Sequence, residues 1–400
     1  MSDFLIQRGT TDFGSSGVGP VTVNLPTSVD ASRAFPRITN VRHGSSGRVA
    51  TAAVNLVNRD LGVKLLNWNG SSFQLERSAG AETQDHRYQW EVWADETPSG
   101  RQPIDGWYVR EVGALSLAGG TAEGNSSTIA SIVNPSQCIP FPLCLSAAGT
   151  SQQWSDGSVS LEMDGQTVKA KRDTPSGPRA VTIYYAVVEF GSSWDINNNL
   201  EIEPGSTSEL VLTGAGDAQP WSNKFLVPTN RVQVGSDRLP DVGMTARYGD
   251  DPDEIRVKLH AGANNPALGG YAMVCHTAYH PLLRVDHYDS FFGYNQIEGR
   301  NATHSLPSAL STDDAAVIAT ADCPGNVQYP GGHWGYELET TSIDFRRGRN
   351  ESAINPCDWS AQVVRFFSAP RGGGGGAAGG GEAGAFLGGG HTCTSIGGGG

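Results

Sequence analysis

The 400-residue sequence predicts an all-β fold of tandem small antiparallel β-sandwich modules, followed by a glycine-rich C-terminal segment. Three observations support this prediction. Val, Thr, Tyr and Trp carry the apolar pattern, whereas the usual helix formers are sparse, with only 4 Met and a charged fraction of 17%. Short alternating segments are separated by turn signals. Finally, one pair of strands recurs four times along the chain.

Each copy of this pair has a short alternating strand that ends near a basic residue, a polar loop, and a second strand rich in aromatic and β-branched residues. The four copies are Phe73–Arg77 with Tyr88–Trp93, Val168–Arg172 with Tyr184–Val188, Ile255–His260 with Tyr271–Cys275, and Ile343–Arg347 with Trp359–Val364. A spacing of 13 residues joins Arg77 to Trp90, Arg172 to Tyr185, Leu259 to Ala272 and Arg347 to Ser360. Tandem modules of one size favour a rod, fibre or shell component over an enzyme with one site.

The repeat predicts β-sandwich modules at residues 1–95, 96–191, 192–280 and 281–370, with the glycine-rich segment at 371–400. About ninety residues are enough to close a modest sandwich core. In module 1 we expect strands at Val21–Leu25, Ala34–Ile38, Thr51–Leu56 and Val63–Leu65, with a tight turn at Asn67–Gly70.

In module 2, Asp164-Gly165 predicts a hairpin between Val159–Met163 and Val168–Ala170. Module 3 is expected to hold strands at Leu210–Leu212 and Phe225–Val227. Module 4 is the most divergent, with Gly331–Gly335 where the others have a simpler loop. We expect no helix of ten or more residues.

The C-terminal segment differs in composition, because 16 of the 29 residues from Gly372 onward are glycine. Such a composition is typical of a flexible linker. The alternative is a segment held in place by packing in extended glycine-rich helices against itself or a partner. The second alternative suggests a chain built into an assembly.

The net charge of −13 is spread along the chain, and the five lysines (Lys64, Lys169, Lys171, Lys224, Lys258) form no basic run. This argues against nucleic acid as a partner, since that binding needs clustered cations. No stretch reaches the roughly eighteen apolar residues that span a bilayer, so we expect no membrane association. The N-terminus lacks the features of a signal peptide, which predicts synthesis and assembly in the cytoplasm.

The search for chemistry finds no catalytic motif, and we expect no cofactor. The six cysteines (138, 144, 275, 323, 357 and 393) do not form a disulfide framework and are expected to be buried thiols, although Cys138–Cys144 or Cys323–Cys357 could oxidise. Asp195–Glu201 has oxygen ligands at alternating positions but lacks the glycine and bidentate acid of a calcium loop, so we expect an Asx-rich turn. Asp250–Glu254 predicts a solvated turn.

One cluster resembles a metal-ligand set. Cys275, His276, His280, His287 and Asp289 lie within fifteen residues. On a strand, however, Cys275 and His276 point to opposite faces, so we expect no metal site.

Tryptophans near predicted turns are the remaining candidates, because an exposed aromatic face can stack on a sugar ring. The predicted carbohydrate-binding residues are Trp68, Trp154, Trp194, Trp221 and Trp334. Trp107 also lies near a predicted turn. The alternative is that these rings pack the loops that close the ends of the sandwiches.

Two segments carry a resemblance to known proteins. Thr182–Gly191, preceded by Val168–Arg172, and the opening Val21–Phe35 resemble modules of bacteriophage virion proteins, especially fibre, spike and decoration components. The order of strands is similar to that of the H-type lectin sandwich, a six-stranded sugar-binding module. The resemblance covers most of modules 1 and 2 and weakens in modules 3 and 4. It transfers no sugar-binding residue, because no binding motif matches.

The resemblance implies a non-enzymatic structural component of the virion, made in the host cytoplasm, that assembles as a homo-oligomer or with other virion proteins. Exposed strand edges would join subunits by β-augmentation. One alternative is an adhesin whose loop aromatics bind glycans of the host surface. A polysaccharide-degrading enzyme is the third alternative.

Overall fold

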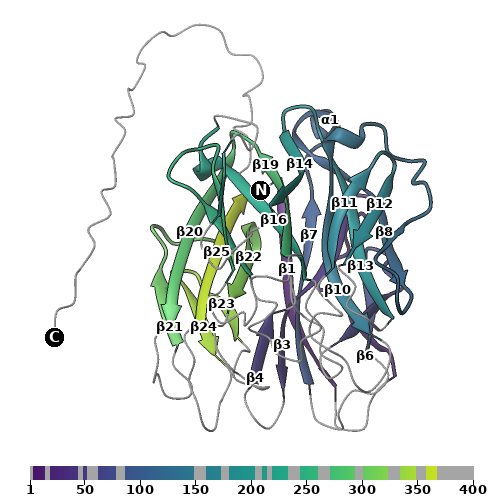
Figure 1. Cartoon of the computed structure of the whole chain (residues 1–400), viewed down its shortest axis with the longest axis horizontal. Helices are drawn as coiled ribbons and strands as arrows, with labels where there is room; N and C mark the ends of the chain where they lie inside the picture. Colours follow the sequence, from purple (N-terminus) through teal and green to yellow (C-terminus); the bar gives the residue numbers. More distant parts are fainter. Residues whose placement is uncertain are drawn as a thin grey trace, which may run out of the picture. The chain divides into compact units, whose positions relative to one another are not determined.

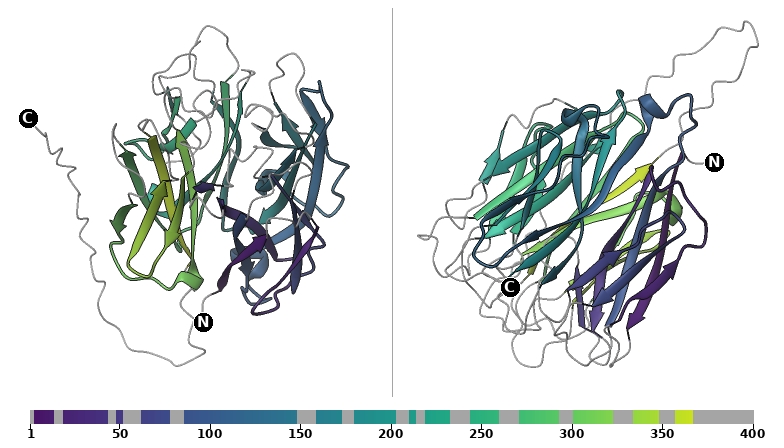
Figure 2. Two further views of the ribbon diagram at one scale, coloured as in Figure 1. Left: turned by 90° about the horizontal axis from the view of Figure 1, so that it is seen from below. Right: turned by 90° about the vertical axis from the view of Figure 1, so that its right-hand side faces the viewer.

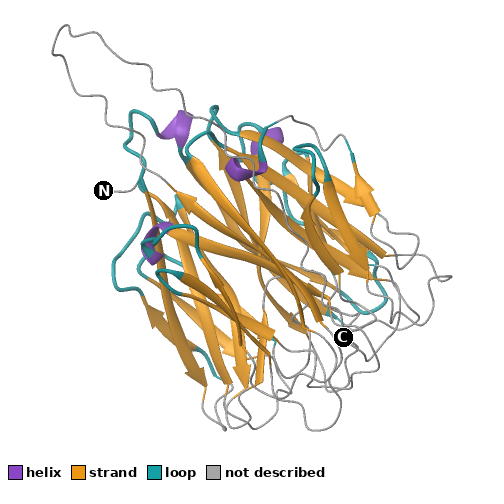
Figure 3. Ribbon diagram, turned by 90° about the vertical axis from the view of Figure 1, so that its left-hand side faces the viewer, coloured by secondary structure: helices purple, strands orange, loops and turns teal. Residues whose placement is uncertain are grey.

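The computed structural model describes residues 3–13, 19–43, 48–51, 62–77, 86–147, 159–172, 180–202, 210–213, 219–232, 244–259, 271–292, 301–322, 334–347 and 357–366. Contacts divide the chain into a compact unit, Met1–Ser368, and a second unit, Ala369–Gly400. The second unit lies outside the described residues, as do the glycine-rich segment and most of Gly331–Gly335. The predicted all-β class is confirmed (Figures 1 and 3).

The strands fall into four sets of six, which we call strands A to F of modules 1 to 4. Module 1 consists of β1 (Phe4–Phe13), β2 (Val21–Asn24), β3 (Ala34–His43), β5 (Val63–Leu66), β6 (Ser72–Arg77) and β7 (His86–Asp95). An additional strand, β4 (Arg48–Thr51), pairs with the end of β3. Module 2 consists of β8 (Trp107–Leu117), β9 (Glu123–Asn125), β10 (Cys138–Ala147), β11 (Ser160–Asp164), β12 (Thr167–Lys171) and β13 (Val181–Phe190).

Module 3 consists of β14 (Asp195–Ile202), β15 (Leu210–Leu212), β16 (Lys224–Val232), β17 (Met244–Tyr248), β18 (Ile255–Leu259) and β19 (Tyr271–Tyr279). Module 4 consists of β20 (Leu283–Phe292), β21 (Asn301–Ser305), β22 (Ala315–Asp322), β23 (Trp334–Leu338), β24 (Ser342–Arg347) and β25 (Cys357–Phe366). The helical segments in the described ranges are α1 (Gln102–Asp105) and the 3-10 turns η1 (Pro135–Gln137), η3 (Trp221–Asn223) and η6 (Thr312–Asp314).

Every module is a sandwich of the same two antiparallel sheets. An inner sheet has the order A-F-C and an outer sheet the order B-E-D, as seen in β20-β25-β22 and β21-β24-β23 (Figures 1 and 2). The E strands alternate between the sandwich core and solvent, as in β6, where Phe73 and Leu75 are buried between half-buried polar residues. This alternation is the period of two that the sequence shows.

The central F strands of the inner sheets are buried on both faces, because one face packs on the outer sheet of the same module and the other faces a core shared by all modules. All but one residue of β13 are buried, and its sequence is accordingly almost continuously apolar. Strand F therefore appears in the sequence as the aromatic and β-branched half of the repeated pair.

The shared core is built from equivalent positions of the four inner sheets. Trp93, Val188, Ala278 and Val364 occupy one such position, since each pairs with the second residue of its strand C. Aromatic rings link the modules: Phe4 contacts Trp107 and Phe366, with both centroid distances 4.8 Å, and Trp107 contacts Trp194 at 6.2 Å. All belong to one continuous cluster of buried apolar residues.

The modules contact one another head to tail. Strand D of one module packs on the inner sheet of the next in every case: β5 on β10, β11 on β14, β16 and β19, β17 on β22 and β25, and β23 on β3 and β4. Module 4 therefore contacts module 1, and the series closes. In the described residues the four modules therefore form a closed series, not a row in which each module contacts only its neighbours along the chain.

Two expectations need correction. Asp195–Glu201 is not a turn, because it forms most of β14, with a bulge between Asn197 and Leu200. The residue equivalent to Trp90 and Tyr185 is Cys275 in module 3 and Ala361 in module 4, not Ala272 and Ser360, because the loop before strand F is longer there. None of the four A strands was expected.

Other expectations hold. Asp250–Glu254 does form a turn, closed by the bond from Gly249 N to Glu254 O (2.9 Å). Of the expected strand Thr51–Leu56, only Thr51 lies within the described residues. Cys138, Cys144 and Cys275 are buried free thiols, while the side chains of the other three cysteines are not described.

Candidate functional site

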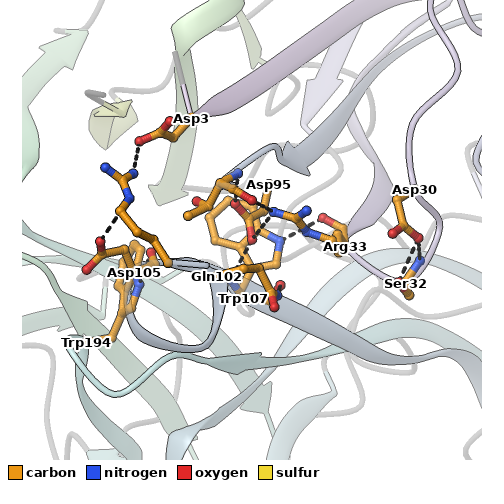
Figure 4. Close-up of polar contacts among 11 residues, drawn as sticks. Asp3, Asp30, Ser32, Arg33, Asp95, Gln102, Asp105, Trp107 and Trp194 are labelled. Atoms are coloured by element: carbon orange, nitrogen blue, oxygen red, sulfur yellow. Dashed lines mark hydrogen bonds and ion pairs between the residues drawn. The ribbon is translucent and has the colours of Figure 1, made fainter. Parts of the chain in front are cut away.

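Polar side chains are concentrated where the connections between modules converge (Figure 4). The buried Asp95 carboxylate ends strand F of module 1. It accepts hydrogen bonds from Thr97 N and Trp107 N, both at 2.8 Å, and pairs with Arg33 at 3.1 Å. Burial raises the pKa of Asp95, although these donors and Arg33 oppose the rise. The group fixes the connection from module 1 to module 2.

A second group in this region contains a Ser, a His and an Asp. Ser193 Oγ lies 3.0 Å from His280 Nε2 and 3.1 Å from Asp105 Oδ1, and His280 Nε2 is 3.8 Å from Asp105 Oδ1. His280 Nδ1 accepts the N–H of Leu282 at 3.1 Å. In a neutral ring the proton must then be on Nε2, which faces the serine.

This arrangement does not activate a nucleophile. A catalytic serine needs an unprotonated nitrogen as its base and a carboxylate on the other nitrogen of the ring. Here Ser193 Oγ also donates to Ile104 O at 2.7 Å, and burial against Trp194 lowers the pKa of His280. The three side chains instead join α1 to the connections that precede β14 and β20.

The junction between modules 2 and 3 is centred on His276, which is fully buried. Its Nε2 donates to Leu161 O at 3.0 Å, and its Nδ1 accepts Asn199 N–H at 3.2 Å. Asn199 also bonds both backbone groups of Met163 in module 2. Burial lowers the pKa of His276 to about 4, so the ring is neutral near pH 7.

At the junction of modules 3 and 4, Gln362 stands in the F-strand position of His276. Its amide accepts Leu226 N–H at 2.7 Å and donates to Leu226 O at 3.0 Å. Tyr248 Oη donates to the same amide oxygen at 2.6 Å. The position thus bonds across a junction in both modules, with a different side chain each time.

A second contact recurs between strand D and strand C of the next module. Thr229 Oγ1 accepts Leu161 N–H at 3.1 Å, and Thr320 Oγ1 accepts Ala246 N–H at 3.1 Å. The Cys144 thiol bonds the backbone of Leu65 at the junction of modules 1 and 2. At the closing junction, the side chains of Thr39 and Tyr336 hydrogen bond.

A third contact joins strand A to the turn between strands B and C of the preceding module. Arg8, Asn198 and His287 hold equivalent positions in strand A. Arg8 donates to Thr312 O and Ala315 O, Asn198 to Cys138 O at 3.2 Å, and His287 Nε2 lies 3.4 Å from Trp221 O. In module 2 the backbone does the same, since Val109 N donates to Ser32 O at 2.7 Å.

The three predicted sugar-binding tryptophans whose side chains are described lie at different places in the fold. Trp194 lies in the shared core with 3% of its surface exposed, as does Trp107 with 2%. Trp221 is half-buried between Tyr248, whose ring is 3.7 Å away, and Lys224 Nζ at 4.0 Å. Trp68 is half-buried in the turn after β5 and donates to Ala34 O at 3.2 Å. Trp154 and the side chain of Trp334 lie outside the described residues.

The outer sheets leave one edge open in each module. The B strands β2, β9, β15 and β21 pair only with strand E in the described ranges, whereas strands D are covered by the next module. In β15 this edge is apolar, with Leu210 and Val211 each 39% exposed. The sequence predicted the strand Leu210–Leu212, but no local pattern showed that this strand lies at an edge.

No family model, curated protein or solved structure matches this chain. Across the described ranges, no three His, Cys, Asp or Glu side chains gather as a metal site requires. Nor does the described part of the chain contain a helix long and apolar enough to cross a bilayer.

Proposed function

We propose that this chain is a non-enzymatic structural component of a bacteriophage particle, of the fibre, spike or decoration type. The observation that supports the proposal is that the buried polar side chains form hydrogen bonds between modules. His276, Gln362 and Arg8 each bond across a junction between modules, and the Ser193–His280 pair joins connections. The side chains that resemble catalytic groups thus hold four equivalent modules together.

The outer surface supports assembly with other copies or other virion proteins. Unpaired strand edges are templates for pairing with another chain, and natural proteins blunt them with charges when no partner is intended. The outward-facing Val211 of β15 lies opposite Arg256 on β18, and no charge interrupts β15 itself. The edge of module 3 is therefore the best candidate for an assembly contact by β-augmentation.

The test compares the full-length protein with V211K in light scattering and negative-stain microscopy over a range of concentrations. We expect oligomers or fibres of the wild type that V211K abolishes, because the lysine points outward at the edge and leaves the sandwich core intact. T303K, on the exposed edge strand of module 4, is the matched control. A wild-type protein that stays monomeric at the highest concentration contradicts the proposal.

A glycan-binding adhesin is the second candidate, favoured by the surroundings of Trp68. Its partly exposed ring lies among amide groups, where Asn67 Nδ2 donates to Gln74 Oε1 at 2.7 Å. Aromatic rings beside planar polar side chains suit sugars. On a glycan array, W68A should lose binding while W221A keeps it, since the Trp221 ring is already packed between two groups.

A further inference from the structure

The closing junction between modules 4 and 1 differs from the other three in its connection. Modules 1 and 2 are joined by residues 96–106, modules 2 and 3 by 191–194, and modules 3 and 4 by 280–282. No such segment leads from module 4 to module 1, because their sequence positions lie at opposite ends of the unit. A short connection keeps a partner module at high effective concentration. Only the closing junction lacks that restraint.

The contacts at this junction come from both edges of module 1. Arg8 on β1 reaches the carbonyls of Thr312 and Ala315, and Thr39 on β3 bonds Tyr336 on β23. Glu91, which is 2% exposed, pairs with Arg8 at 2.9 Å and holds the guanidinium in place. The contacting side chains of module 1 donate hydrogen bonds, whereas the contacting groups of module 4 accept them.

Two different surfaces of one chain, such as those of modules 1 and 4, contact each other within that chain only if the chain brings its first and last modules together. When it does not, the same two surfaces can join different molecules. The ends meet in this unit, since the Phe4 and Phe366 rings are 4.8 Å apart. Opening the junction would free both surfaces and would also expose the shared core where Phe366 packs on Phe4 and Trp93, until a second copy covers it.

We propose that the closing junction is exchangeable, so that module 4 of one chain binds module 1 of a second copy. This rests on the proposed function, because it supplies a route of assembly for a structural protein. Each exchanged contact repeats the one within a single chain. The products are swapped dimers or longer head-to-tail series, and they form at high concentration, where a second copy competes with the chain's own module.

The experiment mixes tagged and untagged full-length protein at high concentration and detects mixed dimers by native mass spectrometry after dilution. We expect mixed dimers whose amount rises with protein concentration. R8A should speed the exchange about tenfold or more, because it removes charge-assisted bonds of the closing contact. R87A is the matched control: it removes an arginine of the same module, whose exposed ion pair with Asp12 lies within module 1.

A circular chain, in which a peptide bond joins residues 1 and 400, gives the closing junction a covalent connection made of residues 367–400 and 1–3. We expect it to form no mixed dimers, and cleavage of its linker should restore them. Mixed dimers of the circular chain, or none from the linear chain, would overturn the inference. The V211K variant separates this result from the proposed edge contact, because it should abolish edge assembly and leave exchange unchanged.

Discussion

Single residues at the junctions form hydrogen bonds that depend on the protonation state of the side chain. His276 donates from one nitrogen and accepts with the other, and both partners are backbone groups, Leu161 O and Asn199 N–H. A second proton on the ring would place two donors against each other at Asn199. The neutral form is therefore the form that fits the junction.

This predicts a loss of stability in acid. The folded pKa of His276 is about 4, below the value near 6.5 of an unfolded chain, so the unfolded state binds the proton first as the pH falls. The contribution is fully present above about pH 6.5 and is lost as the pH falls through 4. Over that window it amounts to about 3 kcal/mol.

Urea unfolding between pH 7 and pH 4 measures the effect. In H276Q, which places the residue of module 4 at the equivalent position, we expect a smaller slope of unfolding free energy against pH. Other groups titrate in both proteins, so the difference between the two slopes isolates His276. Equal slopes would show that this ring does not govern the acid response.

A glycine sets another residue-scale constraint. Gly9 pairs directly with Trp90, and a Cβ built on Gly9 would lie 2.3 Å from the indole ring. We expect G9A to destabilise the protein by about 1–3 kcal/mol, because the buried ring must shift. The midpoint of denaturant unfolding measures this. G19A is the control, since a Cβ there meets nothing within 4 Å, and equal effects of the two changes would refute the packing argument.

At the scale of strands, the position of Gly9 on strand A and Trp90 on strand F can be compared across the four modules. The equivalent pairs are Gly9 with Trp90, Gly113 with Tyr185, Leu200 with Cys275 and Tyr288 with Ala361. The large residue lies on strand F in modules 1 and 2 and on strand A in modules 3 and 4. Each pair combines a small and a large residue although the residues differ between modules, which is the kind of change that a close-packed core tolerates best.

The recurring hydrogen bond between strand D and strand C of the next module is expected to stabilise each junction. In T320V the buried N–H of Ala246 loses its acceptor, which costs about 1–3 kcal/mol. We expect faster hydrogen exchange at the Ala246 amide and its neighbours in β17. T303V, on an exposed strand, leaves exchange in β17 unchanged. If the Ala246 amide were equally protected in both variants, the junction would not depend on this bond.

The sequence did not predict the four A strands, each of which contacts the preceding module. Strands E and F were found because period-two alternation and a continuous apolar run are local patterns. Strand A faces a shared core at one end and a neighbouring turn at the other, so Arg8, Asn198 and His287 occur where a lone sandwich would show apolar residues. The junction residues could not be identified for the same reason, since their partners lie in other modules.

At the scale of the whole unit, the four junctions share geometry but not chemistry. The side chain that bonds across the junction differs each time. It is Cys144 between modules 1 and 2, His276 between modules 2 and 3, and Gln362 between modules 3 and 4. At the closing junction it is Arg8 together with Tyr336. Docking a module at the wrong junction would leave buried polar groups without partners, a cost of about 1–3 kcal/mol each. Unlike polar pairs thus specify the order of modules that would otherwise fit one another interchangeably.

The shared core predicts that these modules unfold together. Repeat proteins that contact only neighbours have stabilities close to a sum over repeats, and their modules can melt separately. Here Trp93 of module 1 contacts Phe141, Phe225 and Phe366, one ring from each other module, so losing one module exposes the core of all. In calorimetry we expect one transition with equal calorimetric and van't Hoff enthalpies.

Two substitutions test this cooperativity against the alternative of independent modules. F366A removes a ring from the shared core, and F73A removes one from the interior of module 1; each should cost about 3–5 kcal/mol. Because the core couples the modules, both should lower the temperature of the single transition without dividing it. If F73A instead splits off a transition of one-quarter size, module 1 unfolds alone and the shared core is only a weak link between the modules.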